Sequence, residues 1–124
     1  MNNHSALIIE DDEFLSEIFS KALQSAEFET EVIRDGQFAM TRLGKTTPDV
    51  VVLDLHLPHV SGRDILRHIR STPHLTATRV MVATADPLMA EFLRDEANLV
   101  LIKPISFTQM RELAMRLHPT YSCA

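Results

Sequence analysis

The sequence contains little of what several broad classes of protein require. It has one cysteine (Cys123), no tryptophan and three glycines, and its longest apolar runs extend over only a few residues. A single cysteine excludes an internal disulfide and is consistent with a reducing compartment. Apolar runs this short cannot cross a bilayer. Lysine and arginine number 12 against 17 aspartate and glutamate residues, so the basic surface typical of nucleic-acid-binding proteins is also missing.

The rest of the composition is that of an ordinary globular protein. The chain has 124 residues, 45% of them hydrophobic and 23% charged, with a formal net charge of −5. This length predicts one domain over residues 1–124 with a single core. The opening residues, MNNHS, lack the basic and apolar segments of a signal peptide. We therefore expect a cytoplasmic protein that contacts neither membranes nor nucleic acid directly.

Short, continuously apolar runs alternate with amphipathic stretches along the chain. Such runs are typical of parallel strands that helices cover on both faces. Four clear runs and one weaker candidate nearer an edge are present: 6–9, 50–53, 80–83 and 99–102, and then 31–33. Five strands alternating with five helices predict an α/β fold, a three-layer, doubly wound (βα)5 sandwich with a five-stranded parallel sheet.

The stretches between these runs have helical periodicity and residues that favour helix starts. Two apolar stripes stand out: Phe14, Leu15, Ile18, Phe19, Ala22, Leu23 and Ala26 in one, and Phe107, Met110, Leu113, Ala114 and Leu117 in the other. Capping residues precede four of the predicted helices: Asp35-Gly36, Ser61-Gly62, Asp86-Pro87, and Ser106 with Gln109.

Polar residues follow the predicted strands at the point where each strand ends. Glu10 and Asp11 follow the first, Asp54 the third, Thr84 closes the fourth, and Lys103 follows the fifth. In a doubly wound sheet, ligands bind outside the carboxyl ends of the strands. We therefore predict one site that combines three carboxylates, a hydroxyl and an ammonium group.

This set of side chains suits phosphoryl transfer. Clustered carboxylates with access to water fit Mg²⁺ better than Zn²⁺. Asp54 is placed to act as a nucleophile, because carboxylates form acyl-phosphate intermediates. Lys103 and the Thr84 hydroxyl can bind phosphoryl oxygens, and this chemistry depends mainly on positioning and charge neutralisation.

The same residues give a resemblance to a known family. Glu10-Asp11, the run DLHLP over 54–58 with Gly62, Thr84-Ala85 and Lys103-Pro104 occur in this order. They resemble the receiver domains of two-component response regulators over essentially the whole chain. The resemblance implies the CheY-like, flavodoxin-like strand order 2-1-3-4-5.

The resemblance also implies roles for individual residues. Asp54 would accept a phosphoryl group from a sensor histidine kinase or a histidine phosphotransfer protein. Asp11 would bind Mg²⁺ directly and Glu10 largely through water, while Asp54 and the backbone carbonyl of His56 would complete the protein ligands. Thr84 and Lys103 would contact the phosphoryl group, and the Lys103–Pro104 bond would be cis.

Two departures from the family pattern concern the output. Val100 occupies the position three before the lysine where the family usually has an aromatic residue, and the segment from Thr84 to Lys103 is shorter than usual. By analogy, a downstream protein target would contact the fourth helix, fifth strand and fifth helix around Phe92, Val100 and Met110. That target is unidentified, and the pattern also allows a homodimer.

Two other motifs are rejected. Residues 39–46 read A-x-x-x-x-G-K-T, but a phosphate-binding P-loop must follow a strand and open a helix. Gly44 is better explained as the end of a helix. His56 and His59 could join Asp54 as metal ligands, but Pro58 and an extended backbone make convergence unfavourable.

The leading hypothesis is therefore a signalling receiver rather than an enzyme, one that promotes its own phosphorylation and dephosphorylation. One alternative is a receiver fold that binds partners without being phosphorylated. The other is a small Mg²⁺-dependent phosphohydrolase with an aspartate nucleophile. The haloacid dehalogenase group, which it would resemble, has a second aspartate two positions after the nucleophile, and this chain has His56 there.

Overall fold

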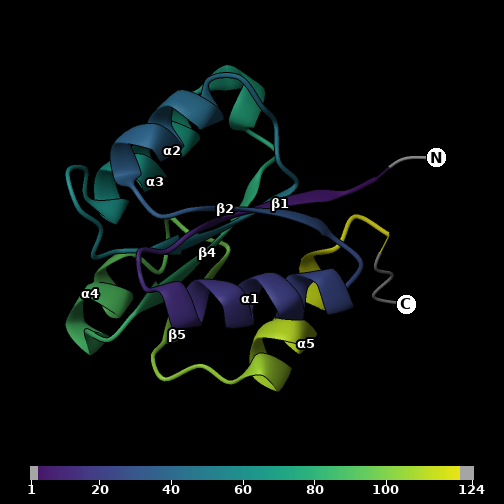
Figure 1. Ribbon diagram of the computed structural model, residues 1–124. Helices are drawn as coiled ribbons and strands as arrows, with labels where there is room; N and C mark the ends of the chain where they lie inside the picture. Colours follow the sequence, from purple (N-terminus) through teal and green to yellow (C-terminus); the bar gives the residue numbers. More distant parts are fainter. Residues whose placement is uncertain (1–2, 121–124) are drawn as a thin grey trace.

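The alternating pattern folds, in the computed structural model, into one sheet with helices on both faces (Figure 1). The structure describes residues 3–120, so Cys123 lies outside it. The strands are β1 (Ser5–Ile9), β2 (Glu29–Ile33), β3 (Val50–Asp54), β4 (Arg79–Thr84) and β5 (Leu99–Ile102). The helices are α1 (Glu13–Ser25), α2 (Gly36–Leu43), α3 (Gly62–Ser71), α4 (Pro87–Phe92) and α5 (Phe107–Leu117), with a short 3-10 turn at Pro73–Leu75. None of the helices within residues 3–120 combines the length and apolar character needed to span a membrane.

The strands lie in the order β2-β1-β3-β4-β5, and every neighbouring pair is parallel. This confirms the predicted fold and strand order. All five residues of the central strand β3 are buried, whereas the edge strand β2 is partly exposed. That difference explains why the run at 50–53 is continuously apolar and the run at 31–33 is the weakest of the five.

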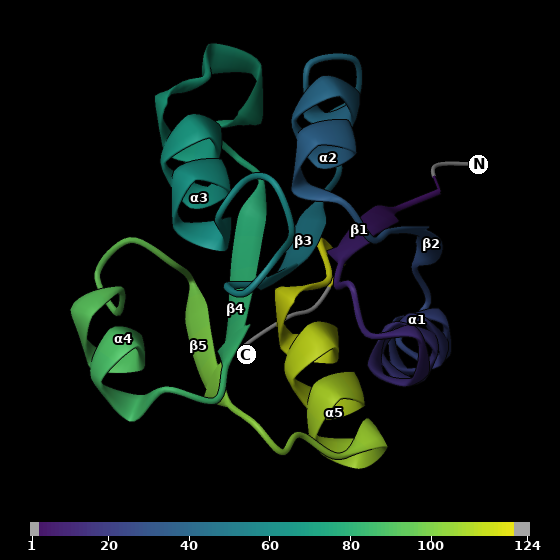
Figure 2. The same ribbon diagram turned by 60° about the vertical axis from the view of Figure 1, so that its left-hand side comes forward.

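Alternating side chains of each strand supply two cores, one on each side of the sheet. In β1, Ala6 and Ile8 pack with α1 and α5, while Leu7 and Ile9 pack with α2 and α3. Figure 2 shows α1 and α5 on one face of the sheet and α2, α3 and α4 on the other. Because a slip of one residue would exchange the two faces, both cores fix the strand register.

The capping residues predicted from sequence all accept backbone hydrogen bonds. Asp35, Ser61, Asp86 and Ser106 begin α2, α3, α4 and α5 in this way. Gly44 is the C-cap residue of α2, as its interpretation as a helix end predicted. The P-loop-like run at 39–46 is therefore the end of a helix and the turn that follows it.

The apolar stripe predicted for α1 is wrong at its first residue. Phe14 is 72% exposed, while Ser16 is completely buried. The buried face of α1 is centred on Ser16, Phe19 and Leu23, and Phe14 lies about 200° around the helix from Ser16. Ser16 is tolerated there because its hydroxyl donates to the Glu13 carbonyl at 2.9 Å.

Gly62 brings the start of α3 against the end of β3. Its amide donates to the Leu55 carbonyl at 3.1 Å. A Cβ atom at this position would meet the Asp54 carbonyl oxygen and lie 2.6 Å from the Leu55 Cα atom. Only glycine fits here without moving the backbone that holds Asp54.

The close approach at Gly62 predicts the effect of adding one methyl group. Gly62→Ala is expected to lower the free energy of unfolding by about 1–3 kcal/mol, because the neighbouring atoms are backbone and cannot move aside cheaply. Urea denaturation measures this change. Gly44→Ala is the matched control, since a Cβ atom there is 3.4 Å from the Thr41 carbonyl oxygen and the backbone is helical. Equal stability of the two variants would contradict the prediction.

Candidate functional site

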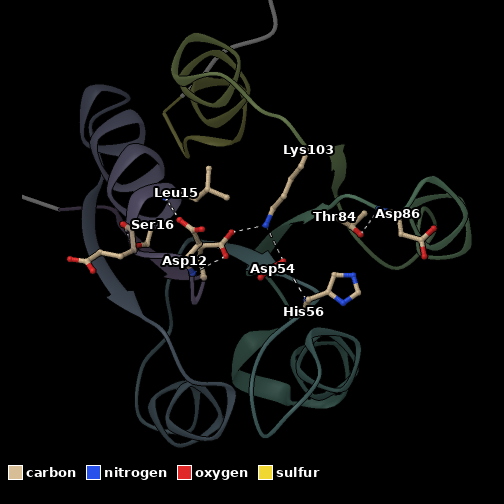
Figure 3. Close-up of polar contacts among 10 residues, drawn as sticks. Asp12, Leu15, Ser16, Asp54, His56, Thr84, Asp86 and Lys103 are labelled. Carbon is tan, nitrogen blue, oxygen red and sulfur yellow. Dashed lines mark hydrogen bonds and ion pairs between the residues drawn. The ribbon is translucent and has the colours of Figure 1, made fainter.

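The polar residues predicted to converge do meet at the carboxyl end of the sheet (Figure 3). Glu10 and Asp54 are almost fully buried, at 1% and 3% exposure, although both are acidic. Lys103 reaches between them from the segment after β5. Its Nζ atom donates to Glu10 Oε1 at 3.0 Å and to Asp54 Oδ1 at 3.2 Å. Strands distant in sequence therefore contribute to one buried cluster of charges.

Burial changes the proton affinity of this cluster. Desolvation, together with the charge of Asp54, raises the pKa of Glu10 to about 7, although the hydrogen bond from Lys103 acts in the opposite direction. For Lys103, burial by itself would lower the pKa. The hydrogen bond to Glu10 and the negative charges of both carboxylates outweigh that effect and raise it. Lys103 is therefore a cation in a site that has an excess of carboxylate groups.

Three carboxylates lie close enough to share a cation. One oxygen from each of Glu10, Asp11 and Asp54 lies within 4.8 Å of the other two. Asp11 is exposed, so water can enter the coordination sphere from its side. A set of hard oxygen ligands that is too small to enclose the ion fits Mg²⁺, which keeps several of its waters.

The two histidines of the following loop do not form a metal site together. The His59 Nδ1 atom lies 2.9 Å from Asp35 Oδ1, at the start of α2. His56 has an exposed side chain, and its backbone amide donates to Asp54 Oδ1 at 3.3 Å. Within residues 3–120, the group of side chains close enough to share a cation consists of the three acids. His59 therefore contacts the start of α2, and the His56 side chain faces solvent.

Thr84 lies at the same end of the sheet, but its hydroxyl interacts with the loop after β4. The side chain is completely buried, and Oγ1 accepts a hydrogen bond from the Asp86 amide at 3.0 Å. The Thr84 carbonyl accepts from the Lys103 amide at 2.8 Å, which fixes its backbone to the segment after β5. The Lys103–Pro104 bond is cis, as the family resemblance implied.

Sequence reasoning missed the contributions of two aspartates. Asp12 caps α1 by accepting from the Leu15 amide at 2.9 Å, and its own amide donates to Glu10 Oε2 at 3.3 Å. The cap preference of aspartate before an amphipathic stretch could have identified this role. Asp86 was predicted as a cap, but the hydrogen bond from its backbone amide to the Thr84 hydroxyl was not, although threonine commonly forms such a local turn.

Comparison with known proteins agrees with this fold and site. Residues 6–115 match the response regulator receiver domain. The chain is 35% identical to the transcriptional regulatory protein TrcR of Mycobacterium tuberculosis, over 90% of this chain and 42% of TrcR. It is 31% identical to the DNA-binding response regulator MtrA of Mycobacterium leprae, over 90% of this chain and 48% of MtrA. The chain thus spans less than half the length of either relative.

Solved structures with low sequence identity share the fold. The chemotaxis response regulator CheY4 of Vibrio cholerae superposes with a TM-score of 0.84 at 22% identity, covering 94% of this chain and 99% of CheY4. A CheY-like response regulator receiver domain from Methylobacillus flagellatus gives a TM-score of 0.82 at 21% identity, covering 94% of this chain and 99% of that domain.

The fold and the acidic site define a CheY-like α/β protein. The chain belongs to the response regulator receiver domains of two-component signal transduction. Proteins of this family are signalling proteins, and their receiver domains typically bind Mg²⁺ at an acidic cluster.

The raised pKa of Glu10 predicts how stability depends on pH in metal-free buffer. The ordinary value is 4.5 and the folded value is about 7, so the folded state favours the protonated carboxyl. This contribution to stability is fully present below the ordinary value and is lost as the pH rises through about 7. We expect the free energy of unfolding to fall by about 2–4 kcal/mol over this range, because a tenfold change in proton affinity corresponds to about 1.4 kcal/mol.

Urea denaturation at a series of pH values measures this loss, with Glu10→Gln as the control. The variant cannot ionise at this position, so its stability should change less over the same range. Mg²⁺ should restore more stability to the wild type near pH 8 than near pH 5, because the Glu10 carboxyl attracts the ion only when it is ionised. Identical pH dependence in the wild type and the variant would contradict the assignment.

Proposed function

We propose that this chain is a receiver domain that accepts a phosphoryl group on Asp54 in a Mg²⁺-dependent reaction. The donor would be a sensor histidine kinase or a histidine phosphotransfer protein. The observation that supports this most directly is the position of Asp54, which is buried, bonded to Lys103 and within 4.8 Å of two further carboxylate groups. A buried carboxylate paired with a cation beside an acidic cluster suits acyl-phosphate formation.

The metal ligands in this proposal are Asp11 and Asp54 directly, Glu10 largely through water, and the backbone carbonyl of His56. Bound Mg²⁺ would neutralise charge on the carboxylates and on the incoming phosphoryl group. The acidic residues supply the hard oxygen atoms that this ion requires, and the exposure of Asp11 leaves room for water.

Asp54 and Lys103 act on the phosphoryl group itself. A carboxylate oxygen of Asp54 forms the new P–O bond while the P–N bond of the phosphohistidine breaks and the imidazole leaves with the electron pair. The Lys103 ammonium, now 3.2 Å from Asp54 Oδ1, binds a phosphoryl oxygen and compensates the charge that arrives there. The Thr84 hydroxyl donates to another phosphoryl oxygen. Hydrolysis of the acyl phosphate by water returns Asp54 to its starting state.

The phosphohydrolase alternative has less support. Such an enzyme needs an acid near the nucleophile to protonate the leaving group. The residue two positions after Asp54 is His56, and its side chain is exposed. His56 replaces the aspartate that the haloacid dehalogenase group has at this position, which favours a receiver that promotes its own phosphorylation and dephosphorylation over turnover of a separate phosphate ester.

In this proposal the protein is cytoplasmic, where its kinase can reach it. The signal leaves the receiver through protein–protein contact. Phe92 is 64% exposed on α4 and can contact a partner, whereas Met110 is completely buried. The prediction that Met110 belongs to the contact surface is therefore wrong, because this side chain fills the core between α5 and the sheet. The downstream target and a homodimer are both compatible with an exposed α4 surface. DNA binding in MtrA is a property of that longer protein.

Intact-mass spectrometry after incubation with acetyl phosphate tests the proposal. We expect one phosphoryl adduct on the wild type that requires Mg²⁺ and is absent from Asp54→Asn. Lys103→Met should form the adduct at least tenfold more slowly, because the compensating cation is lost.

A negative result would favour the remaining alternative. A receiver fold used only for binding would form no adduct, and its partner would bind wild type and Asp54→Asn equally well. The replacement of the usual aromatic residue by Val100 is the feature that keeps this alternative open. Repeated turnover of acetyl phosphate without any adduct would instead indicate the phosphohydrolase.

A further inference from the structure

In this chain, β5 lacks a side chain that could carry a movement of Thr84 to the surface. Val100 is a half-buried aliphatic residue that packs against the core on the α2–α3 side of the sheet. It has no ring that could move between two positions, and it carries no polar side-chain group. A change in the position of the Thr84 side chain therefore needs another path to reach the surface.

The contacts of Thr84 indicate where that path begins. Its carbonyl is tied to the Lys103 amide, so the backbone at the end of β4 is fixed to the segment after β5. Its hydroxyl has a different partner, the amide of Asp86 at 3.0 Å. A displacement of the hydroxyl therefore acts first on Asp86, in the exposed loop that leads into α4.

Asp86 joins this loop to the helix. Its carboxylate Oδ1 accepts from the amides of Leu88 at 3.0 Å and Met89 at 3.3 Å, and its carbonyl accepts from Ala90 at 3.0 Å. The first amides of a helix have no partner within the helix, so these bonds hold the first turn of α4 in place. One residue therefore contacts both the Thr84 hydroxyl and the start of α4.

The opposite end of α4 is anchored independently. Leu93, directly after the helix, is completely buried. Arg70 on α3 then holds the turns that follow, donating to the Glu96 carbonyl at 2.9 Å and to Asn98 Oδ1 at 2.7 Å. Asn98 in turn accepts from the Val80 amide of β4 at 2.8 Å. The C-terminal end of α4 is fixed to the sheet, whereas Leu88 at its start is 83% exposed.

We infer that Asp86 is a positioning residue that couples the Thr84 hydroxyl to the N-terminal turn of α4. Through it, the state of the site reaches the exposed side chains of Leu88 and Phe92, and α4 responds at its first turn while Arg70 holds the other end. The Arg63 guanidinium, 4.6 Å from the Phe92 ring centroid, links this response to the start of α3. The trigger in this inference rests on the proposed phosphorylation of Asp54, but the coupling between Thr84 and α4 exists without it.

Amide hydrogen exchange, followed by mass spectrometry, tests the coupling in the unphosphorylated protein. Thr84→Val removes the hydroxyl that accepts from Asp86 while nearly preserving side-chain shape, and Thr84→Ser restores a hydroxyl. We expect residues 88–92 to exchange about fivefold faster in Thr84→Val than in wild type, a change typical of losing a cap-linked hydrogen bond. Thr84→Ser should return exchange toward the wild-type rate. Unchanged exchange in Thr84→Val would overturn the inference.

The second arm adds Mg²⁺ and beryllium fluoride, a phosphoryl mimic. In wild type and Asp86→Asn, which keeps an oxygen acceptor, exchange at residues 88–92 should change on addition of the mimic. In Asp86→Ala, the amides of α4 should exchange about fivefold faster than in wild type before the mimic is added. Adding the mimic should then change their exchange much less than in wild type. ¹⁹F NMR should still detect bound fluoride in this variant. Ser106→Ala, which removes the cap bond to Gln109 at the start of α5, is the matched control and should leave α4 unchanged.

The two arms separate failure of the inference from failure of the proposed function. Absence of bound fluoride in wild type, together with faster α4 exchange in Thr84→Val, would reject phosphorylation and retain the coupling. Bound fluoride with a full α4 response in Asp86→Ala would reject the role of Asp86. A wild-type response confined to β5 and α5 would reject α4 as the route.

Discussion

The pair of hydrogen bonds from Lys103 to Glu10 and Asp54 is the interaction on which the site depends. Two carboxylates that are at least 97% buried would repel each other and lack hydration if no cation lay between them. The bonds of 3.0 and 3.2 Å supply that cation. One negative charge remains uncompensated. Burial of Glu10, together with the charge of Asp54, therefore raises the pKa of Glu10 to about 7. The site is therefore organised around a charge that a metal ion or a proton can balance.

The rest of the fold keeps these three groups in place. Glu10 directly follows β1 and Asp54 ends β3. The side chains of both strands enter both cores, so neither strand can shift without exposing apolar surface on both faces. Gly62 closes the arrangement by bringing α3 against the backbone of Asp54 and Leu55. The precision of the site thus comes from the packing of the sheet and not from the polar residues themselves.

The α4–β5 region of the molecule is built differently from the site. The six residues of α4 are followed by turns rather than by further helix, and Arg70 donates hydrogen bonds to these turns at Glu96 and Asn98. An exposed Phe92 stacks under Arg63, whereas Val100 in β5 packs into the core. The most exposed apolar side chains in this region, Leu88 and Phe92, lie on α4, and Asp86 holds its first turn.

The sequence by itself determined the fold class, the order of elements, the helix caps and the identity of the residues at the strand ends. It could do so because burial on two faces, helical periodicity and capping are local patterns. The tertiary structure alone decided three other things. It showed that Phe14 points outward and Met110 inward, because the centre of a buried helix face depends on what packs against it. It showed that Lys103 pairs with both carboxylates, and that Arg70 holds the turns after α4. Those contacts join residues whose relation is set by chain geometry in three dimensions, which local patterns in a sequence do not record.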